Sequence, residues 1–101
     1  MKVSAASVCA EAARLVAGDR EKTHGPKMEN FRNIAEMMTG YLRARRLLKE
    51  GVSLTALDAS LLMCQMKIAR TMAGGYNPDD FVDLAGYAGC AGEIADQLRD
   101  V

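Results

Sequence analysis

The chain has 101 residues, the size of one small domain, so we treat residues 1–101 as a single unit. Thirteen cationic and thirteen anionic side chains cancel, so no net field favours nucleic acid or an anionic membrane as a partner. No apolar run approaches the roughly 20 residues of a membrane span, and we find no signal-peptide pattern, so we expect a cytoplasmic protein. Half of the residues are apolar but only five are aromatic, which favours packed helices over a β-sandwich.

The metal-binding and redox residue types are few. Cys9, Cys64 and Cys90 are odd in number and far apart in apolar surroundings, so we expect buried, reduced thiols and no disulfide framework. His24 is the single histidine and no CxxC pair occurs, so the sequence offers no zinc site. We therefore expect no cofactor, except for Mg²⁺ if the chain is a hydrolase.

Helical signals divide the first half of the chain into two segments. Apolar residues recur at helical spacing over 5–17, and Gly18 stands where a C-terminal glycine belongs. Pro26 fits the first turn of a second helix, whose apolar stripe continues to Leu48 and which we expect to end at Gly51. Four basic residues near its end are expected on a solvated face favoured by the helix dipole: Arg43, Arg45, Arg46 and Lys49.

The second half predicts two further helices. Thr55 and Asp58 have the spacing of a capping box, which starts a third helix over about 56–73. This helix is apolar almost all round, so it is buried on more than one side. Asn77 followed by Pro78 and two aspartates starts a fourth helix over about 78–99.

Three glycines in the fourth helix, Gly86, Gly89 and Gly92, each cost helix stability relative to alanine, by about 1 kcal/mol. We expect them to permit close approach of a neighbouring helix or of a second subunit. The sequence thus predicts an all-α, compact four-helix domain with a short first helix and two antiparallel hairpins. We expect a homo-oligomer, completed through the third and fourth helices.

Charges gather around the turn between the third and fourth helices. Lys67 and Arg70 are three residues apart and so share a helix face, while Asp79, Asp80 and Asp83 start the next helix. One interpretation is an interhelical salt-bridge clamp. In the other interpretation, part of this positive charge binds a phosphate, and Arg70 is suited to a bidentate contact with it.

The chain also resembles an uncharacterised family of short phage and prophage proteins. The resemblance covers nearly the whole chain and rests on six motifs. They are GDR (Gly18–Arg20), HG (His24–Gly25), ENF (Glu29–Phe31), LDAS (Leu57–Ser60), KIAR (Lys67–Arg70) and D-x-x-x-D-LAGY (Asp79–Tyr87). The family usually has Tyr where this chain has His24. The resemblance implies a phage origin and carries no settled activity.

A more distant similarity concerns chemistry. Asp80 and Asp83, followed by Tyr87, resemble the second acidic motif of MazG-like nucleotide pyrophosphohydrolases, which hold Mg²⁺ against a triphosphate between two acidic motifs. The first motif, E-x-x-E, is missing. Where carboxylates are expected the chain offers Lys67 and Arg70, and these cations would repel Mg²⁺ and attract phosphate.

Three hypotheses follow. The first is a binding protein that sequesters a phosphorylated nucleotide signal of host immunity, cyclic or derived from ADP-ribose, without hydrolysing it. Its expected ligand contacts are Arg20, His24, Asn30, Lys67, Arg70, Asp83 and Tyr87. The second is a Mg²⁺-dependent nucleoside triphosphate pyrophosphohydrolase with Asp80 and Asp83 as metal ligands. The third is a structural or interaction protein with a salt-bridged hairpin. We favour a protein that is not an enzyme.

Overall fold

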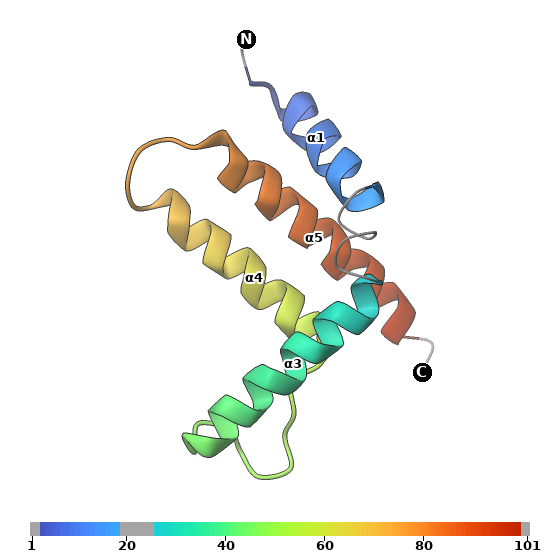
Figure 1. The fold of residues 1–101 in the computed structure, drawn as a ribbon, viewed down its shortest axis with the longest axis vertical. Coiled ribbons are helices and arrows are strands. Elements are labelled where there is room, and N and C mark those ends of the chain that lie inside the picture. The colour runs from blue at the N-terminus through green and yellow to red at the C-terminus, as the bar shows by residue number, and fades with distance from the viewer. Residues whose placement is uncertain (1–2, 19–25, 100–101) are drawn as a thin grey trace.

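The computed structural model describes residues 3–18 and 26–99. Within these ranges it contains four α-helices and no strand: α1 (Ala5–Ala17), α3 (Lys27–Ala44), α4 (Ala56–Thr71) and α5 (Pro78–Leu98) (Figure 1). The predicted all-α class with four helices is thereby confirmed. No helix in the described part of the chain is long and apolar enough to cross a membrane.

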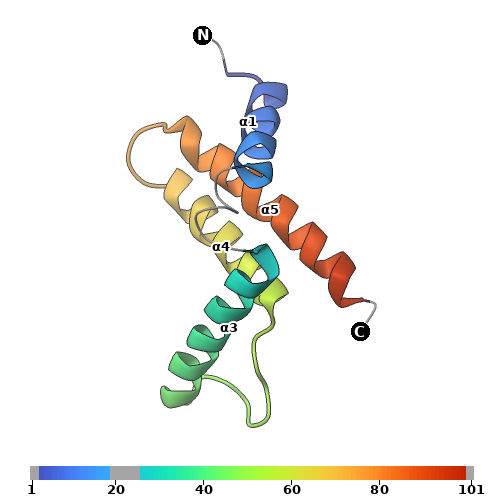
Figure 2. The same ribbon diagram turned by 45° about the vertical axis from the view of Figure 1, so that its right-hand side comes forward.

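Helices α4 and α5 form the predicted antiparallel hairpin, side by side in both ribbon views (Figures 1 and 2). The start of α4 is fixed by the capping box, in which the Thr55 side chain accepts from the Asp58 N–H at 3.2 Å and Asp58 accepts from the Thr55 N–H at 2.9 Å. The start of α5 is capped by Asn77, whose Oδ1 accepts from the Asp79 N–H at 3.1 Å. Both helix starts are therefore set by local hydrogen bonds.

Helix α1 packs against α5 at the first of the three glycines. A Cβ added to Gly86 would meet Val16 Cγ1 at 3.4 Å, an ordinary van der Waals contact, so α1 is the neighbour of Gly86 but does not require a glycine there. Gly89 and Gly92 have no such neighbour, since an added Cβ would meet nothing within 4 Å. Within the described residues a neighbouring helix thus lies beside Gly86 only, and the expectation that the three glycines permit a close approach stays a prediction.

The second helix ends earlier than predicted. Helix α3 stops at Ala44, and Arg46 adopts a φ of 61°, the left-handed conformation that usually favours glycine after a helix. The Leu47 N–H donates to the Leu42 carbonyl at 2.9 Å and the Arg46 N–H to the Arg43 carbonyl at 3.0 Å, which is the Schellman pattern. The expectation that the helix continues to Gly51 is wrong, because Arg46 closes it five residues sooner.

The prediction of two antiparallel hairpins holds for only one pair. Helix α3 crosses α4 steeply, and the two helices diverge towards the end of α3 (Figures 1 and 2). The connection folds back onto α3 through side chains: Thr39 Oγ1 accepts from the Leu54 N–H at 2.9 Å, and Arg43 donates to the Val52 carbonyl at 2.9 Å. A long connection anchored in this way leaves the two helices free to cross.

The core lies where α3, α4 and α5 meet. Its buried members are small or medium-sized apart from Phe31 and Ile94, and Ile94 is fully buried. They are Phe31, Ala35, Ala56, Ala59, Cys90 and Ile94. Of the cysteines, Cys64 and Cys90 are buried as expected, but Cys9 is exposed, so the expectation of three buried thiols is wrong for α1.

Candidate functional site

The two cations of the KIAR segment have different surroundings. Lys67 is buried, and its Nζ lies 2.9 Å from Asp83 Oδ2, with side-chain exposures of 9% and 20%. The pair joins α4 to α5 across the hairpin. Of the three aspartates proposed as partners, the structure therefore selects Asp83. Asp79 and Asp80 lie in the first turn of α5, at the positive end of its dipole.

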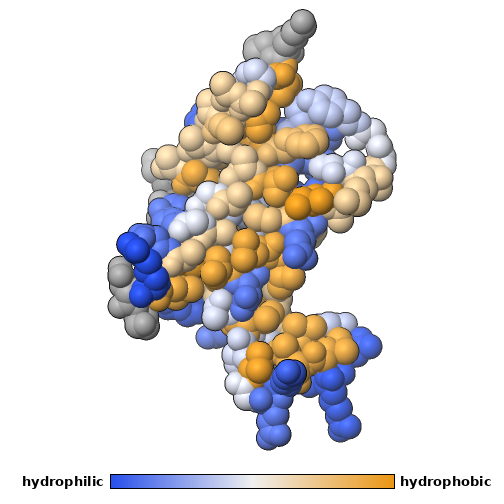
Figure 3. All heavy atoms as spheres, turned by 180° about the vertical axis from the view of Figure 1, so that it is seen from behind, coloured by the Kyte–Doolittle hydropathy of each residue, from blue (hydrophilic) through white to orange (hydrophobic). Residues whose placement is uncertain are grey.

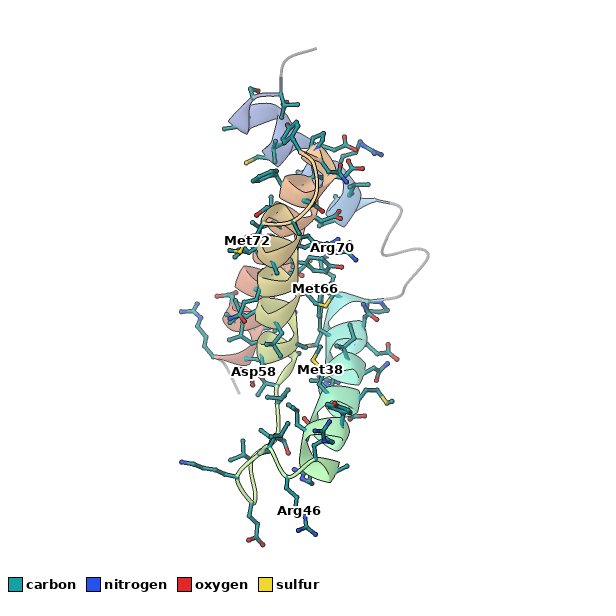
Figure 4. The ribbon with its side chains drawn as sticks, turned by 90° about the vertical axis from the view of Figure 1, so that its left-hand side faces the viewer. Met38, Arg46, Asp58, Met66, Arg70 and Met72 are labelled. Carbon is teal, nitrogen blue, oxygen red and sulfur yellow. The ribbon has the colours of Figure 1, made fainter. Side chains whose placement is uncertain are left out.

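Arg70 lies one turn further along α4 and is exposed. In the described part of the chain its guanidinium makes no ion pair or hydrogen bond. It projects on the side of α4 that carries Met66, opposite Met72 (Figure 4). Arg70 is therefore a cation held out to solvent beside a buried pair.

Asn30 and Tyr87 lie at a second junction, where the start of α3 meets α5. The ring of Phe31, the neighbour of Asn30, contacts the Tyr87 ring edge-on with a centroid distance of 6.2 Å. Lys27 pairs with Glu93 at 3.5 Å and so ties the same turn of α3 to α5. Both Asn30 and Tyr87 are half-buried. The Tyr87 side chain is thus positioned by packing against the core.

Two of the predicted ligand contacts, Arg20 and His24, lie outside the described residues. The other five are Asn30, Lys67, Arg70, Asp83 and Tyr87, and among them the structure joins Lys67 to Asp83 directly.

The acidic residues are dispersed in the part of the chain that the structure describes. Among residues 3–18 and 26–99, no three His, Cys, Asp or Glu side chains lie close enough to hold a metal ion together. Asp58 is used in its capping box, and Asp83 is held by the Lys67 ammonium. The Lys67 ammonium lies against Oδ2 of Asp83, and its positive charge opposes a divalent cation at the same carboxylate.

The Cys64 thiol is not suited to nucleophilic chemistry. It lies one turn before Lys67 on α4 and is buried. Burial raises the pKa of the Cys64 thiol above its ordinary value, because the thiolate would lose its hydration. The thiol is therefore neutral at physiological pH.

Sequence reasoning missed an open apolar groove between α3 and α4. It has a volume of about 440 Å³ and is lined by Met37, Met38, Tyr41, Leu42 and Leu62. Met37 and Tyr41 are 77% and 59% exposed. The available signal was that these two residues lie off the apolar stripe of α3 and are nevertheless large and apolar.

Comparisons with known proteins show which proteins are similar to this chain. It is 43% identical over 91 residues to the "Gene 55 protein" of Mycobacterium phage D29, and 37% identical over 83 residues to the "Gene 55 protein" of Mycobacterium phage L5. These matches cover 90% and 82% of this chain but 55% and 49% of the relatives, so it spans about half the length of the curated relatives it matches. No solved structure matches.

A family match covers most of the chain. The matching family is described as "Domain of unknown function (DUF6378)", and the match extends over residues 7–95. The expected resemblance to an uncharacterised family with phage members is confirmed, and the similarity to MazG-like enzymes stays a prediction. The chain belongs to the DUF6378 family.

Proposed function

We propose that this chain is a binding protein that holds an anionic, phosphorylated ligand without turning it over, and that Arg70 contacts the phosphate. The observation that carries the proposal is the contrast within KIAR: Lys67 is neutralised by Asp83 at 2.9 Å, while Arg70 is exposed beside it. In this proposal the Lys67–Asp83 ion pair has a structural role. It fixes the segment of α4 from which Arg70 projects.

A phosphorylated nucleotide is the ligand class that suits such a residue. A guanidinium makes two parallel hydrogen bonds to a phosphate, and these are among the strong hydrogen bonds of proteins. Asn30 and Tyr87 would add neutral hydrogen-bonding groups at the neighbouring α3–α5 junction. In a phage protein, holding such a ligand unchanged would sequester a nucleotide signal of host immunity.

Retention without hydrolysis is favoured by the state of Asp83. A MazG-like pyrophosphohydrolase needs several free carboxylate oxygens to hold Mg²⁺. Here Asp83 lies against the Lys67 ammonium, whose positive charge opposes a metal ion at the same carboxylate. Pyrophosphate release from nucleoside triphosphates with Mg²⁺, lost in Asp80→Ala and in Asp83→Ala variants that are shown to stay folded, would establish the hydrolase instead.

The binding proposal is tested by isothermal titration calorimetry. The panel contains cyclic dinucleotides, ADP-ribose derivatives and ordinary nucleoside mono-, di- and triphosphates. We expect one class to bind at micromolar concentrations, and we expect Arg70→Gln to weaken that binding by about 10- to 100-fold, the loss of a charge-assisted hydrogen bond. Arg99→Gln is the matched control, because Arg99 is also exposed and already pairs with Asp96 at 3.0 Å. Absence of binding across the panel would contradict the proposal.

The second candidate is an interaction protein in which the charged residues only hold the hairpin. It is favoured by the closure of the Lys67–Asp83 pair, which leaves neither side chain available to a ligand. Ligand binding by Arg70→Gln separates the two candidates, because coupling of Lys67 and Asp83 in a double-mutant cycle of stability is expected under both. If Lys67 and Asp83 couple in stability and Arg70→Gln affects no ligand, the second candidate is correct.

A further inference from the structure

The groove between α3 and α4 is an apolar surface that no helix in the described part of the chain covers. It has a volume of about 440 Å³ and is lined by Met37, Met38, Tyr41, Leu42 and Leu62. The two helices diverge from their crossing, and the groove opens between them (Figure 1). In Figure 4 the side chains of Met38 and Met66 lie on the side of α4 that faces α3. Because Met66 follows Leu62 by one turn, it continues the α4 wall of the groove.

A fixed guanidinium stands at one end of the groove. Arg45 follows Tyr41 by one turn, and its Nη1 donates to the Tyr41 hydroxyl at 3.0 Å. Its guanidinium carbon also lies 5.9 Å from the centre of the Tyr41 ring, a cation–π contact. Both contacts hold the cation of Arg45 against a residue that lines the groove. This end of the groove is therefore positively charged.

The segment around this end carries an excess of positive charge. Residues 37–55 contain four cations and one anion, a net charge of +3, although the charges of the whole chain cancel. The four cations are exposed: Arg43, Arg45, Arg46 and Lys49. Arg46 projects beyond the end of α3 (Figure 4). From behind, a hydrophobic patch at the lower right, where α3 ends, is bordered by hydrophilic side chains (Figure 3). Such a border favours an anionic partner.

The shape of the groove favours a helix over a small molecule. Small-molecule sites enclose most of their ligand, whereas this groove is open. Among the lining residues the one polar side-chain group is the Tyr41 hydroxyl, which already accepts from Arg45, so a nucleobase would leave most of its polar edge unpaired. An amphipathic helix buries only one face, and flexible methionine walls adapt to its side chains. Helical anchors at i, i+4 and i+7 span about 10 Å, and α3 rises about 12 Å from Met37 to Arg45.

A second copy of the chain suits this groove less well. In a two-fold contact the same surface lies on both sides, so two segments of net charge +3 would share one interface. Like charges brought together oppose association. The expectation of a homo-oligomer through the third and fourth helices stays a prediction.

We propose that the α3–α4 groove binds an amphipathic helix of a protein partner, and that this helix carries acidic residues beside its apolar anchors. The anchors pack between Met37 and Leu62, and a carboxylate at one end pairs with Arg45. The proposal is independent of the phosphate-binding role of Arg70, because Arg70 lies two turns after Leu62 and does not line the groove. Arg70→Gln should therefore leave helix binding unchanged even where it removes a nucleotide.

A displayed peptide library tests the chemistry of the partner. Its peptides of about 18 residues, or five turns of helix, carry leucines at positions i, i+4 and i+7, and their other exposed positions vary among Glu, Gln and Lys. The fluorescently labelled full chain is used to sort the library. We expect the binders to be enriched in glutamate beside one end of the leucine row and depleted in lysine.

Fluorescence anisotropy with the best binder, made as a synthetic peptide, then locates the site. We expect Met37→Glu to raise the dissociation constant about 10-fold or more, because it places a charge in the apolar contact. Met72→Glu is the matched control, since Met72 is 79% exposed against 77% for Met37 but does not line the groove. Circular dichroism checks that each variant keeps its helices.

Charge reversal at Arg45 tests the basic end of the groove. We expect Arg45→Glu to weaken binding about 3- to 10-fold. We also expect this variant to bind a peptide whose end glutamate is changed to lysine better than the wild-type chain does. Arg32→Glu is the matched control, because Arg32 is an exposed arginine of α3 that lies nine residues, or two and a half turns, before Tyr41 and hence on the opposite side of the helix.

Four outcomes would overturn the proposal. A library without binders, or with binders enriched in lysine, would show that the groove takes no acidic helix. Equal losses in Met37→Glu and Met72→Glu would place the binding outside the groove. Binding to phosphatidylglycerol vesicles that exceeds peptide binding and is lost in Arg45→Glu would assign this surface to a membrane. Self-association in sedimentation velocity that is lost in Met37→Glu would assign it to a second copy.

Discussion

The α4–α5 pair and the α3–α4 pair are held together by different forces. The first is an antiparallel hairpin with a short turn, capped by Asn77 and joined by the buried Lys67–Asp83 pair. The second is a steep crossing with a long connection, anchored by hydrogen bonds from side chains to backbone at Thr39 and Arg43. The comparison teaches that a buried ion pair joins the two helices of the hairpin, whereas hydrogen bonds from side chains to backbone tie the long connection to the helix that crosses it.

The largest expected effect comes from breaking the ion pair. Asp83→Ala should destabilise the fold by about 3–5 kcal/mol, because the buried Lys67 ammonium would lose its counter-charge. Lys67→Met combined with Asp83→Leu should recover most of this loss, since apolar packing replaces a buried ion pair at little cost. Urea unfolding measures all four members of the cycle. A single mutant as stable as the wild type would show that the pair is open in solution.

A smaller effect is expected at the anchor of the crossing helix. Thr39 is buried and accepts from the Leu54 N–H at 2.9 Å, so Thr39→Val leaves that N–H without its acceptor. We expect a loss of about 1–3 kcal/mol in chemical unfolding. Thr71→Val is the control, because the Thr71 hydroxyl is exposed and donates within its own helix to the Ile68 carbonyl. Equal effects at both threonines would mean that the connection is not anchored by Thr39.

Replacement of Arg46 should change the stability of the fold in the opposite direction. Its φ of 61° is costly for a residue with a Cβ, so Arg46→Gly should raise stability by about 0.5–1 kcal/mol in thermal unfolding. Arg45→Gly is the comparison, because Arg45 has a φ of −83° and gains no backbone relief. A destabilising Arg46→Gly would indicate that the arginine side chain contributes more than its conformation costs.

The smallest effect concerns the Cys64 thiol on the buried side of α4. Because burial raises its pKa in the fold, the unfolded thiol ionises first as the pH rises. Stability should thus be fully present below the ordinary thiol pKa, about 8.5, and decline as the pH rises from there towards the raised pKa. The difference in unfolding free energy between wild type and Cys64→Ala should shrink over that window. A pH-independent difference would contradict the burial of the thiol.

Sequence reasoning succeeds here where the interactions are local. The Thr55–Asp58 and Asn77 caps join residues two or three apart, and Asp83 was one of three candidates for Lys67 because a short turn fixes how the hairpin closes. The early end of α3 could not be predicted, since Arg46 takes a glycine conformation within a connection whose anchors lie 9 and 15 residues apart in sequence.

The candidate site was predicted in part, for the same reason. The spacing of Lys67 and Arg70 indicates a shared face, but burial differs along that face because α5 covers the first residue and not the second. Cys9 shows the same limit, because an apolar neighbourhood in sequence did not give burial on α1. The exposure of a residue depends on which helices pack against its own helix. The steep crossing of α3 is set by contacts between residues far apart in the sequence, so local patterns do not predict it.

The most direct measurement of the central claim is nitrogen-15 NMR of the lysine side chains at neutral pH. A closed, buried Lys67–Asp83 pair predicts one ammonium group that exchanges slowly with water, whose signal disappears in Lys67→Met and in Asp83→Asn and persists in Arg70→Gln. If every lysine ammonium exchanges at the rate of a solvated side chain, Lys67 is not paired, and the division between a structural lysine and a ligand-binding arginine is wrong.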